Sequence, residues 1–171
     1  MRTQFSDEAT QAIIPEDKAV DLSLKNGQWQ IVREATPTLL GITGDPNLPL
    51  SRDKNDPNIV DSDGDGKPGV TVRLIIGGLI KGKIYIIRRE VFKNIVTVES
   101  ADRIRGTVID ESEQFILGAS LKMLAKPSNP VQNPDPKMNP LLLNRLPAHI
   151  KTCDQLMENR DELFPPAPEF F

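Results

Sequence analysis

The central part of the chain alternates hydrophobic and polar residues with the two-residue period that is typical of β-strands. The clearest example is residues 70–76, where every second side chain is aliphatic and β-branched residues dominate. Gly77-Gly78 follows directly and favours a turn. Similar patterns predict further strands over residues 28–34, 36–42, 79–89, 91–98, 103–110, 114–124 and 141–146.

The connections between these predicted strands are short, and short connections join antiparallel neighbours. Residues 110–113, Asp-Glu-Ser-Glu, have the composition of a hairpin turn. A single helix is predicted near the end of the chain, over about residues 148–163, from an apolar stripe at helical spacing. We therefore expect a mainly β fold, an antiparallel meander that closes into a β-barrel or a sandwich, with one C-terminal helix packed outside it.

The length of 171 residues, with 38% hydrophobic and 26% charged residues, suits one domain with a modest core. Residues 1–26 are polar and mixed, and we interpret them as an N-terminal arm. Residues 27–171 then form a single domain. This domain includes a long Gly, Pro, Asn and Asp-rich loop over residues 43–69 and a proline-rich connector over residues 127–140.

The motif with the strongest chemical meaning lies at the end of that loop. Asp61, Asp63 and Asp65 alternate with small residues, and Gly66 follows them. Calcium takes several hard oxygen ligands at once, and carboxylates at every second position with a glycine at the sixth can wrap one ion. Three carboxylates this close would repel one another without a cation. A metal-free Asp/Gly turn is the alternative interpretation.

This motif resembles the calcium loops of the EF-hand, dockerin and thrombospondin type 3 families. The resemblance implies Ca²⁺ as the ion and the backbone carbonyl of Lys67 as a further ligand. Val72 stands where an EF-hand loop has a bidentate glutamate, so the motif is not a complete EF-hand. Asp53 and Asp56, upstream in the same loop, are candidates for the missing ligands.

Gly27-Gln28-Trp29 opens the first predicted strand and is similar to the Gly-x-Trp signature of the lipocalins and the wider calycin group. The resemblance implies a barrel in which Trp29 plugs one end and Arg145, from the last strand, packs across it. The alternative for Trp29 is an ordinary core aromatic. The Gly-x-Trp strand, the aspartate loop and the meander together also look like bacterial cell-envelope proteins.

Two further pairs of residues are weaker candidates. Arg88 and Arg89 are adjacent in a strand and should face opposite ways, so Arg88 and the nearby Tyr85 are possible ligand-facing residues of a barrel. His149 and Cys153 lie four residues apart on one helix face, but other zinc ligands or an orienting group are not evident.

Charge and cysteine content limit the partners and the compartment. The net charge of −3 gives no reason to expect nucleic acid, although residues 70–105 hold eight basic and three acidic residues. That stretch predicts either solvated strand faces or an anion-binding face. Cys153 has no partner for an internal disulfide, no stretch is long and apolar enough to span a membrane, and the opening residues do not resemble a signal peptide. The aspartate loop favours a compartment rich in calcium, outside the cytoplasm.

The sequence therefore predicts a calcium-stabilised, extracytoplasmic β-barrel binding module, with a small apolar or amphipathic ligand if the barrel is hollow. The alternative is a structural or adhesive surface domain with a solid core and no small-molecule ligand. An enzyme is disfavoured, because the sequence contains no glycine-rich phosphate loop, serine elbow or metalloprotease motif.

Overall fold

The computed structural model describes residues 2–5, 7–11, 17–128 and 130–164 and contains two antiparallel five-stranded sheets. The first sheet consists of β1 (Arg2–Phe5), β5 (Val70–Ile76), β6 (Ile80–Glu90), β4 (Thr38–Leu40) and β9 (Glu113–Ala119). The second consists of β10 (Pro140–Asn144), β8 (Arg103–Asp110), β7 (Phe92–Ser100), β3 (Gln28–Arg33) and β2 (Asp21–Lys25). The helices are short: α1 (Asp7–Gln11), α2 (Cys153–Glu158), α3 (Arg160–Leu163) and the 3₁₀ turns η1 (Lys122–Leu124) and η2 (Pro136–Met138).

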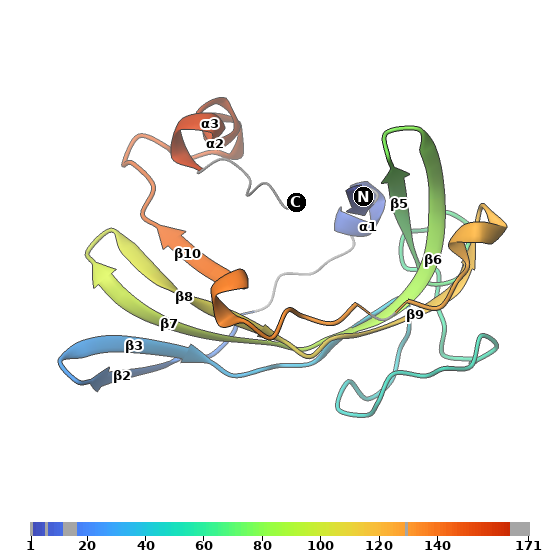
Figure 1. Cartoon of the computed structure of the whole chain (residues 1–171), viewed down its shortest axis with the longest axis horizontal. Coiled ribbons are helices and arrows are strands. Elements are labelled where there is room, and N and C mark those ends of the chain that lie inside the picture. The colour runs from blue at the N-terminus through green and yellow to red at the C-terminus, as the bar shows by residue number, and fades with distance from the viewer. Residues whose placement is uncertain (1, 6, 12–16, 129, 165–171) are drawn as a thin grey trace.

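The two sheets are continuous with each other, because long strands run from one into the other. β6 leads into β7 and β8 leads into β9, while β6 pairs with β9 and β7 pairs with β8. Where the named strands break, the Glu111 amide donates to the Val91 carbonyl and the Val91 amide donates to the Ser112 hydroxyl, both at 3.0 Å. The result is one curved layer, which Figure 1 shows edge-on with β5 and β6 rising at one end.

A mainly β, antiparallel fold is thus confirmed, but closure into a barrel is wrong, since the two sheets do not close. The predicted hairpin turn at residues 110–113 is also wrong. The chain continues there from β8 into β9 and reverses instead at residues 101–102, between β7 and β8. A meander of short strands could curl around on itself, whereas two long paired strands make an open, bent sheet.

Individual elements differ from their predicted bounds for local reasons. The predicted strands 70–76 and 103–110 are confirmed to the residue. The strand predicted over residues 114–124 ends at Ala119 and is followed by η1, and the C-terminal helix is split in two at Asn159. Residues 2–5 and 21–25, which we expected in an arm, pair with β5 and β3.

Hydrophobic side chains cover both faces of the first sheet. One cluster, on the inner face of the curve, consists of Val72, Leu74, Ile84, Ile86 and Ile116. The other, on the outer face, consists of Ile42, Leu50, Ile87 and Leu117, two of which come from the segment between β4 and β5. This segment therefore covers the outer face, and burying each aliphatic side chain stabilises the fold by about 1.5–3 kcal/mol.

Candidate metal site and adjoining groove

Three aspartates of the loop before β5 come together in space. Asp61, Asp63 and Asp65 each offer a carboxylate oxygen, and these oxygens all lie within 4.8 Å of one another. Asp61 and Asp65 are exposed, whereas Asp63 is only 8% exposed. A set of carboxylate oxygens is the ligand chemistry of hard divalent cations such as calcium and magnesium. The triad could therefore hold a metal ion.

Glycines and backbone amides give the loop its tight path. Gly64 and Gly66 have φ angles of 66° and 79°, a left-handed conformation that residues with a Cβ rarely adopt. This path lets the Asp61 carboxylate accept hydrogen bonds from the Asp65 amide, at 3.2 Å, and from the Gly66 amide, at 2.8 Å. These two backbone amides, four and five residues later in the chain, thus hold the Asp61 carboxylate in place.

Thr71, the second residue of β5, attaches the triad to the sheet. Its backbone amide donates to Asp63 Oδ2 at 2.9 Å, and its hydroxyl donates to Asp65 Oδ2 at 2.8 Å. The Thr71 side chain is itself 2% exposed. Because a buried residue has few alternative positions, it fixes two of the three carboxylates relative to β5.

The loop also packs tightly against the backbone of β6. A Cβ added at Gly69 would overlap the Ile86 carbonyl oxygen and lie 2.9 Å from the Ile86 carbonyl carbon. A Cβ added at Gly41 would lie 2.7 Å from the Gly69 Cα. On the other edge of β6, the pairing with β9 shifts register between Tyr85 and Ile86. Three backbone segments therefore stack closely beside the triad.

The other residues that the sequence suggested as ligands lie elsewhere in the loop. Asp53 Oδ1 accepts from the Asn55 amide, and Asp56 Oδ1 accepts from the Asn58 amide, both at 2.9 Å. Hydrogen bonds from the Ser51 side chain and the Asn58 backbone hold the pKa of Asp56 below its ordinary value. Among the described residues, the acidic group that could hold a metal contains neither of these aspartates.

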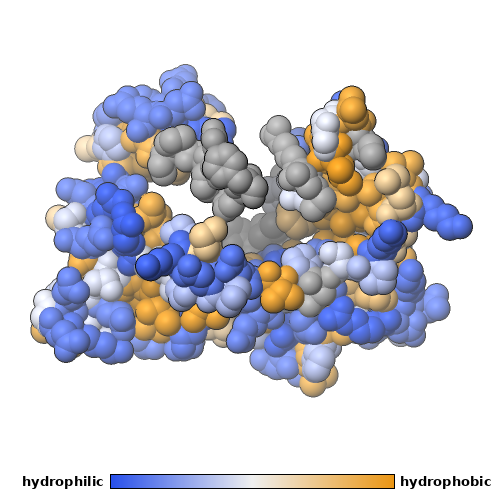
Figure 2. All heavy atoms as spheres, in the orientation of Figure 1, coloured by the Kyte–Doolittle hydropathy of each residue, from blue (hydrophilic) through white to orange (hydrophobic). Residues whose placement is uncertain are grey.

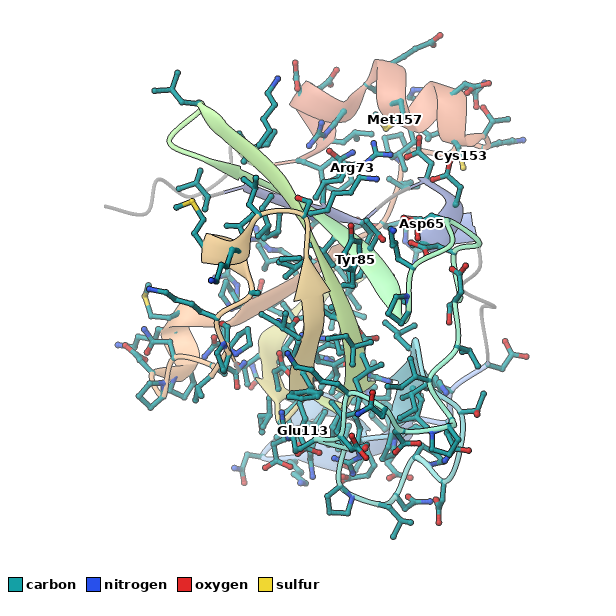
Figure 3. All side chains as sticks on the ribbon, turned by 90° about the vertical axis from the view of Figure 1, so that its right-hand side faces the viewer. Asp65, Arg73, Tyr85, Glu113, Cys153 and Met157 are labelled. Carbon is teal, nitrogen blue, oxygen red and sulfur yellow. The ribbon has the colours of Figure 1, made fainter. Side chains whose placement is uncertain are left out.

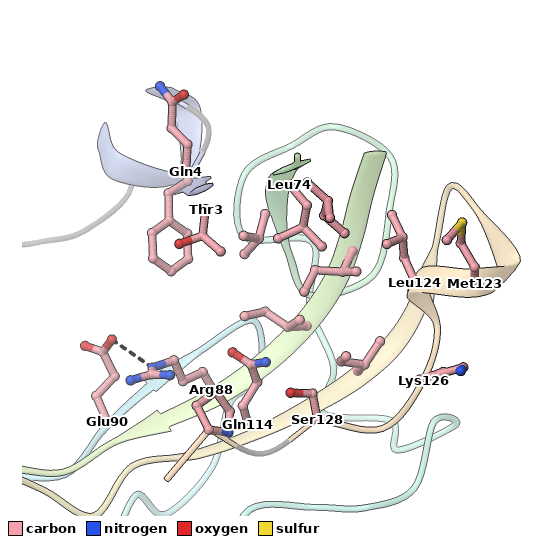
Figure 4. Close-up of a pocket in the computed structure, with 17 residues that line it drawn as sticks. Thr3, Gln4, Leu74, Arg88, Glu90, Gln114, Met123, Leu124, Lys126 and Ser128 are labelled. Carbon is pink, nitrogen blue, oxygen red and sulfur yellow. Dashed lines mark hydrogen bonds and ion pairs between the residues drawn. The ribbon is translucent and has the colours of Figure 1, made fainter. Parts of the chain in front are cut away.

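A groove of about 470 Å³ lies on the inner face of the first sheet, which is the face opposite the triad. Its floor is aliphatic, and its rim is polar at one end, where Arg88, Glu90 and Gln114 lie close together (Figure 4). Figure 2 shows hydrophobic residues gathered around the hollow on the β5–β6 side. Because side chains alternate along a strand, Thr71 faces the aspartates while Val72 faces the groove.

Arg88, one of the two residues suggested as ligand-facing, lines this groove. Its Nε donates to Glu90 Oε1 at 3.2 Å, and its Nη2 lies 3.9 Å from Asp110 Oδ2. Two carboxylates thus already compensate the charge of the Arg88 guanidinium, so the carboxylate of a ligand would gain little by binding there. Tyr85, the second candidate, packs against the outer cluster on the other face of β6.

The remaining candidates do not assemble with the triad or the groove. Trp29 is 50% exposed, and Arg145 donates to the Ala101 carbonyl and pairs with Asp102 at 3.0 Å. A plug of the lipocalin kind needs a closed barrel, which these sheets do not form. Cys153 is exposed at the start of α2.

Sequence reasoning missed Thr71, which is the link between the aspartates and the sheet. The sequence did contain a signal for Thr71: it is a hydroxyl residue in the otherwise apolar Val70-Thr71-Val72 stretch, which directly follows the aspartate loop. Sequence reasoning also missed Glu113, whose carboxylate binds Leu50 and Arg89 and so fastens the loop to β9 and β6. Nothing in the sequence pattern brings these distant residues together.

Comparison with known proteins gave no relative: no family model, no curated protein and no solved structure matches this chain. Among the described residues, no helix has the length and apolar character needed to cross a lipid bilayer.

Proposed function

We propose that this protein is a calcium-stabilised binding module that acts outside the cytoplasm, in which the aspartate triad holds Ca²⁺ and the inner groove takes an apolar ligand. The proposal is supported chiefly by one observation: Asp63 and Asp65 are both bonded to Thr71, and the next residue of β5 lines the groove. An ion at the triad would therefore fix the strand on which the groove is built.

Electrostatics favour a structural role for the ion. Bringing three carboxylates within 4.8 Å costs energy unless a cation compensates their charge. A bound ion would remove that cost and would tie the long segment between β4 and β5 to the sheet. Exposed Asp61 and Asp65 leave one side of the triad open, where water or backbone carbonyls such as that of Lys67 would complete the coordination.

Thermal unfolding with added calcium or with a chelator tests this role. An ion at 100 times its dissociation constant should stabilise the native state by about 2.7 kcal/mol. Asp63→Asn should abolish this increase, while Asp53→Asn, which changes an aspartate of the same loop outside the triad, should retain it. A parent protein whose midpoint does not respond to calcium, or an Asp63→Asn variant that responds like the parent, would remove the metal from the proposal.

The groove supports an apolar ligand better than an amphipathic acid. Its floor is formed by the aliphatic side chains of the inner cluster, and its volume of about 470 Å³ falls within the range of small-molecule sites. Arg88 would be the natural partner of a ligand carboxylate, but Glu90 and Asp110 already surround it. A neutral head group that exchanges hydrogen bonds with Gln114 or Ser128 fits this rim better.

Binding of the neutral apolar dye N-phenyl-1-naphthylamine, followed by its fluorescence, tests the groove. Thr3→Trp should reduce binding, since Thr3 pairs with Leu74 and so shares the groove face of the sheet. Arg73→Trp is the matched control, because Arg73 follows Val72 on β5, its side chain alternates to the other face, and it does not line the groove. Absence of dye binding to the parent would favour the alternative, a structural or adhesive surface domain.

A further inference from the structure

The end of the β5–β6 hairpin presents a hydrophobic residue to solvent. Leu79 is 90% exposed and follows Gly77 and Gly78, whose φ angles of 58° and 73° turn the chain. The hairpin end also projects from the rest of the sheet (Figure 1). A single exposed leucine is common on protein surfaces, so the residues around Leu79 decide whether it belongs to a binding surface.

Three cations lie just behind this tip on the outer face of the hairpin. Arg73 pairs directly with Lys83, and Lys81 pairs with Ile75, so the three side chains occupy neighbouring positions on one face. Figure 3 shows Arg73 further toward the hairpin end than Tyr85, and away from Glu113 at the other end of the sheet. None of the salt bridges between described residues involves Arg73, Lys81 or Lys83.

The turn η1, from a distant part of the sequence, packs on the inner face of the same hairpin end, opposite the three cations. A Cβ added at Gly82, which alternates with Lys81 and Lys83 along β6, would overlap Leu124 Cδ1 and lie 3.4 Å from Leu121 Cδ1. The turn brings Lys122 to the hairpin together with Met123, which is 58% exposed.

The strands and the turn that carry these cations contain no acidic residue, because residues 70–89 and 114–134 contain no aspartate and no glutamate. The aspartate triad lies at the other end of the same face of β5, where Thr71 bonds Asp63 and Asp65. Directly opposed like charges such as Arg73 and Lys83 destabilise a sheet unless a counter-charge is nearby. We use the name basic hairpin surface for the set of residues Arg73, Leu79, Lys81, Lys83, Lys122 and Met123.

We propose that the basic hairpin surface docks on an anionic lipid bilayer, with Leu79 entering the interface and the cations contacting phosphate head groups. Charge complementarity selects the anionic partner, since each Lys or Arg near such a surface contributes attraction. The exposed Leu79 and Met123 select a bilayer over a soluble polyanion, because a polyanion offers no apolar phase in which to bury them. The inner groove is lined by Met123 and Ile76, so docking would place one end of the groove near the lipid.

Flotation of the full chain with vesicles tests this proposal. The protein should bind vesicles containing 30% phosphatidylglycerol in phosphatidylcholine and should not bind phosphatidylcholine alone. The triple variant R73Q/K81Q/K83Q should partition about a hundredfold more weakly, at about fivefold per cation. Leu79→Ser should lose roughly tenfold through the lost apolar burial, while its thermal midpoint stays that of the parent because the side chain is 90% exposed.

A triple variant of the second sheet is the matched control. K93Q/R103Q/R105Q also removes three positive charges, but from residues that pair with Glu34 and Glu99. It should bind anionic vesicles nearly as well as the parent. Three results would each overturn the proposal: no binding of the parent to anionic vesicles, an equal loss in the control variant, or full binding by Leu79→Ser. The last result would assign the surface to a soluble polyanion.

Discussion

Replacing Gly69 by alanine should destabilise the protein more than any ordinary Gly→Ala change in a turn. Gly69 has a φ of +85°, and a Cβ there would overlap the Ile86 carbonyl oxygen and lie 3.1 Å from Leu117 Cδ1. Two separate costs follow, one from the backbone conformation and one from the contact. Gly27→Ala isolates the first, because Gly27 has a φ of +79° and no atom within 4 Å of the added Cβ.

The left-handed conformation costs an L-residue about 1–2 kcal/mol, and both variants incur this cost. Overpacking of a close contact adds about 1–3 kcal/mol, and only Gly69→Ala incurs it, because its obstacle is backbone that cannot rotate away. The free energy of unfolding should therefore differ between the two variants by about 2 kcal/mol. In a chain of this size that difference lowers the unfolding midpoint by roughly 4–8 °C.

Urea unfolding followed by far-ultraviolet circular dichroism, with and without calcium, measures both variants under identical conditions. Gly69→Ala should also weaken calcium stabilisation, since Gly69 accepts from the Ser62 amide at 3.1 Å and donates to the Val60 carbonyl at 2.9 Å. Gly27→Ala should leave the calcium response unchanged. Equal losses of stability in the two variants would refute the close packing of the loop on β6.

Two further substitutions examine how the loop is fastened. Thr71→Val removes the hydroxyl that donates to Asp65 Oδ2 at 2.8 Å and should cost about 1–2 kcal/mol, whereas Thr71→Ser should cost less, as measured by urea unfolding in calcium. Glu113→Ala removes the acceptor of the Leu50 amide, 3.1 Å away, and should cost about 2 kcal/mol; because that amide is uncharged, much of the loss should persist in 1 M salt.

Local patterns were sufficient to predict strands that have one apolar and one polar face. They were insufficient where contacts with residues distant in the sequence determine the structure. The bounds of the strands Val70–Ile76 and Arg103–Asp110 follow from the side-chain sequence alone. Asn26-Gly27 is the strongest two-residue hairpin signal, and it joins β2 to β3. Treating residues 1–26 as an arm left that signal unused, so β2 was not predicted.

The wrong prediction of a closed barrel has a physical cause at residues 110–113. Asp and Ser favour turns when only nearest neighbours are considered. Here the Ser112 hydroxyl instead accepts from the Val91 amide, and the Gln132 side chain donates to the Val108 carbonyl and accepts from the Asp110 amide. These polar side chains satisfy the backbone where the long strands bend, a role that no local propensity describes.

β5 carries both the attachment of the triad and the first cation of the basic hairpin surface, so the two proposed activities should be coupled. Thr71 bonds Asp63 and Asp65, and Arg73 lies two residue steps further along the same face of β5. Two steps span about 7 Å, which is within the screening length of about 8 Å at physiological ionic strength. A calcium ion at the triad would offset the attraction that the carboxylates exert on Arg73 and would leave the positive charge of the surface available to lipid head groups. Calcium should therefore raise the vesicle affinity of the parent, and the Asp63→Asn variant, which loses the ion, should show no such rise. A parent protein whose unfolding midpoint responds to calcium while its vesicle affinity does not would refute this coupling.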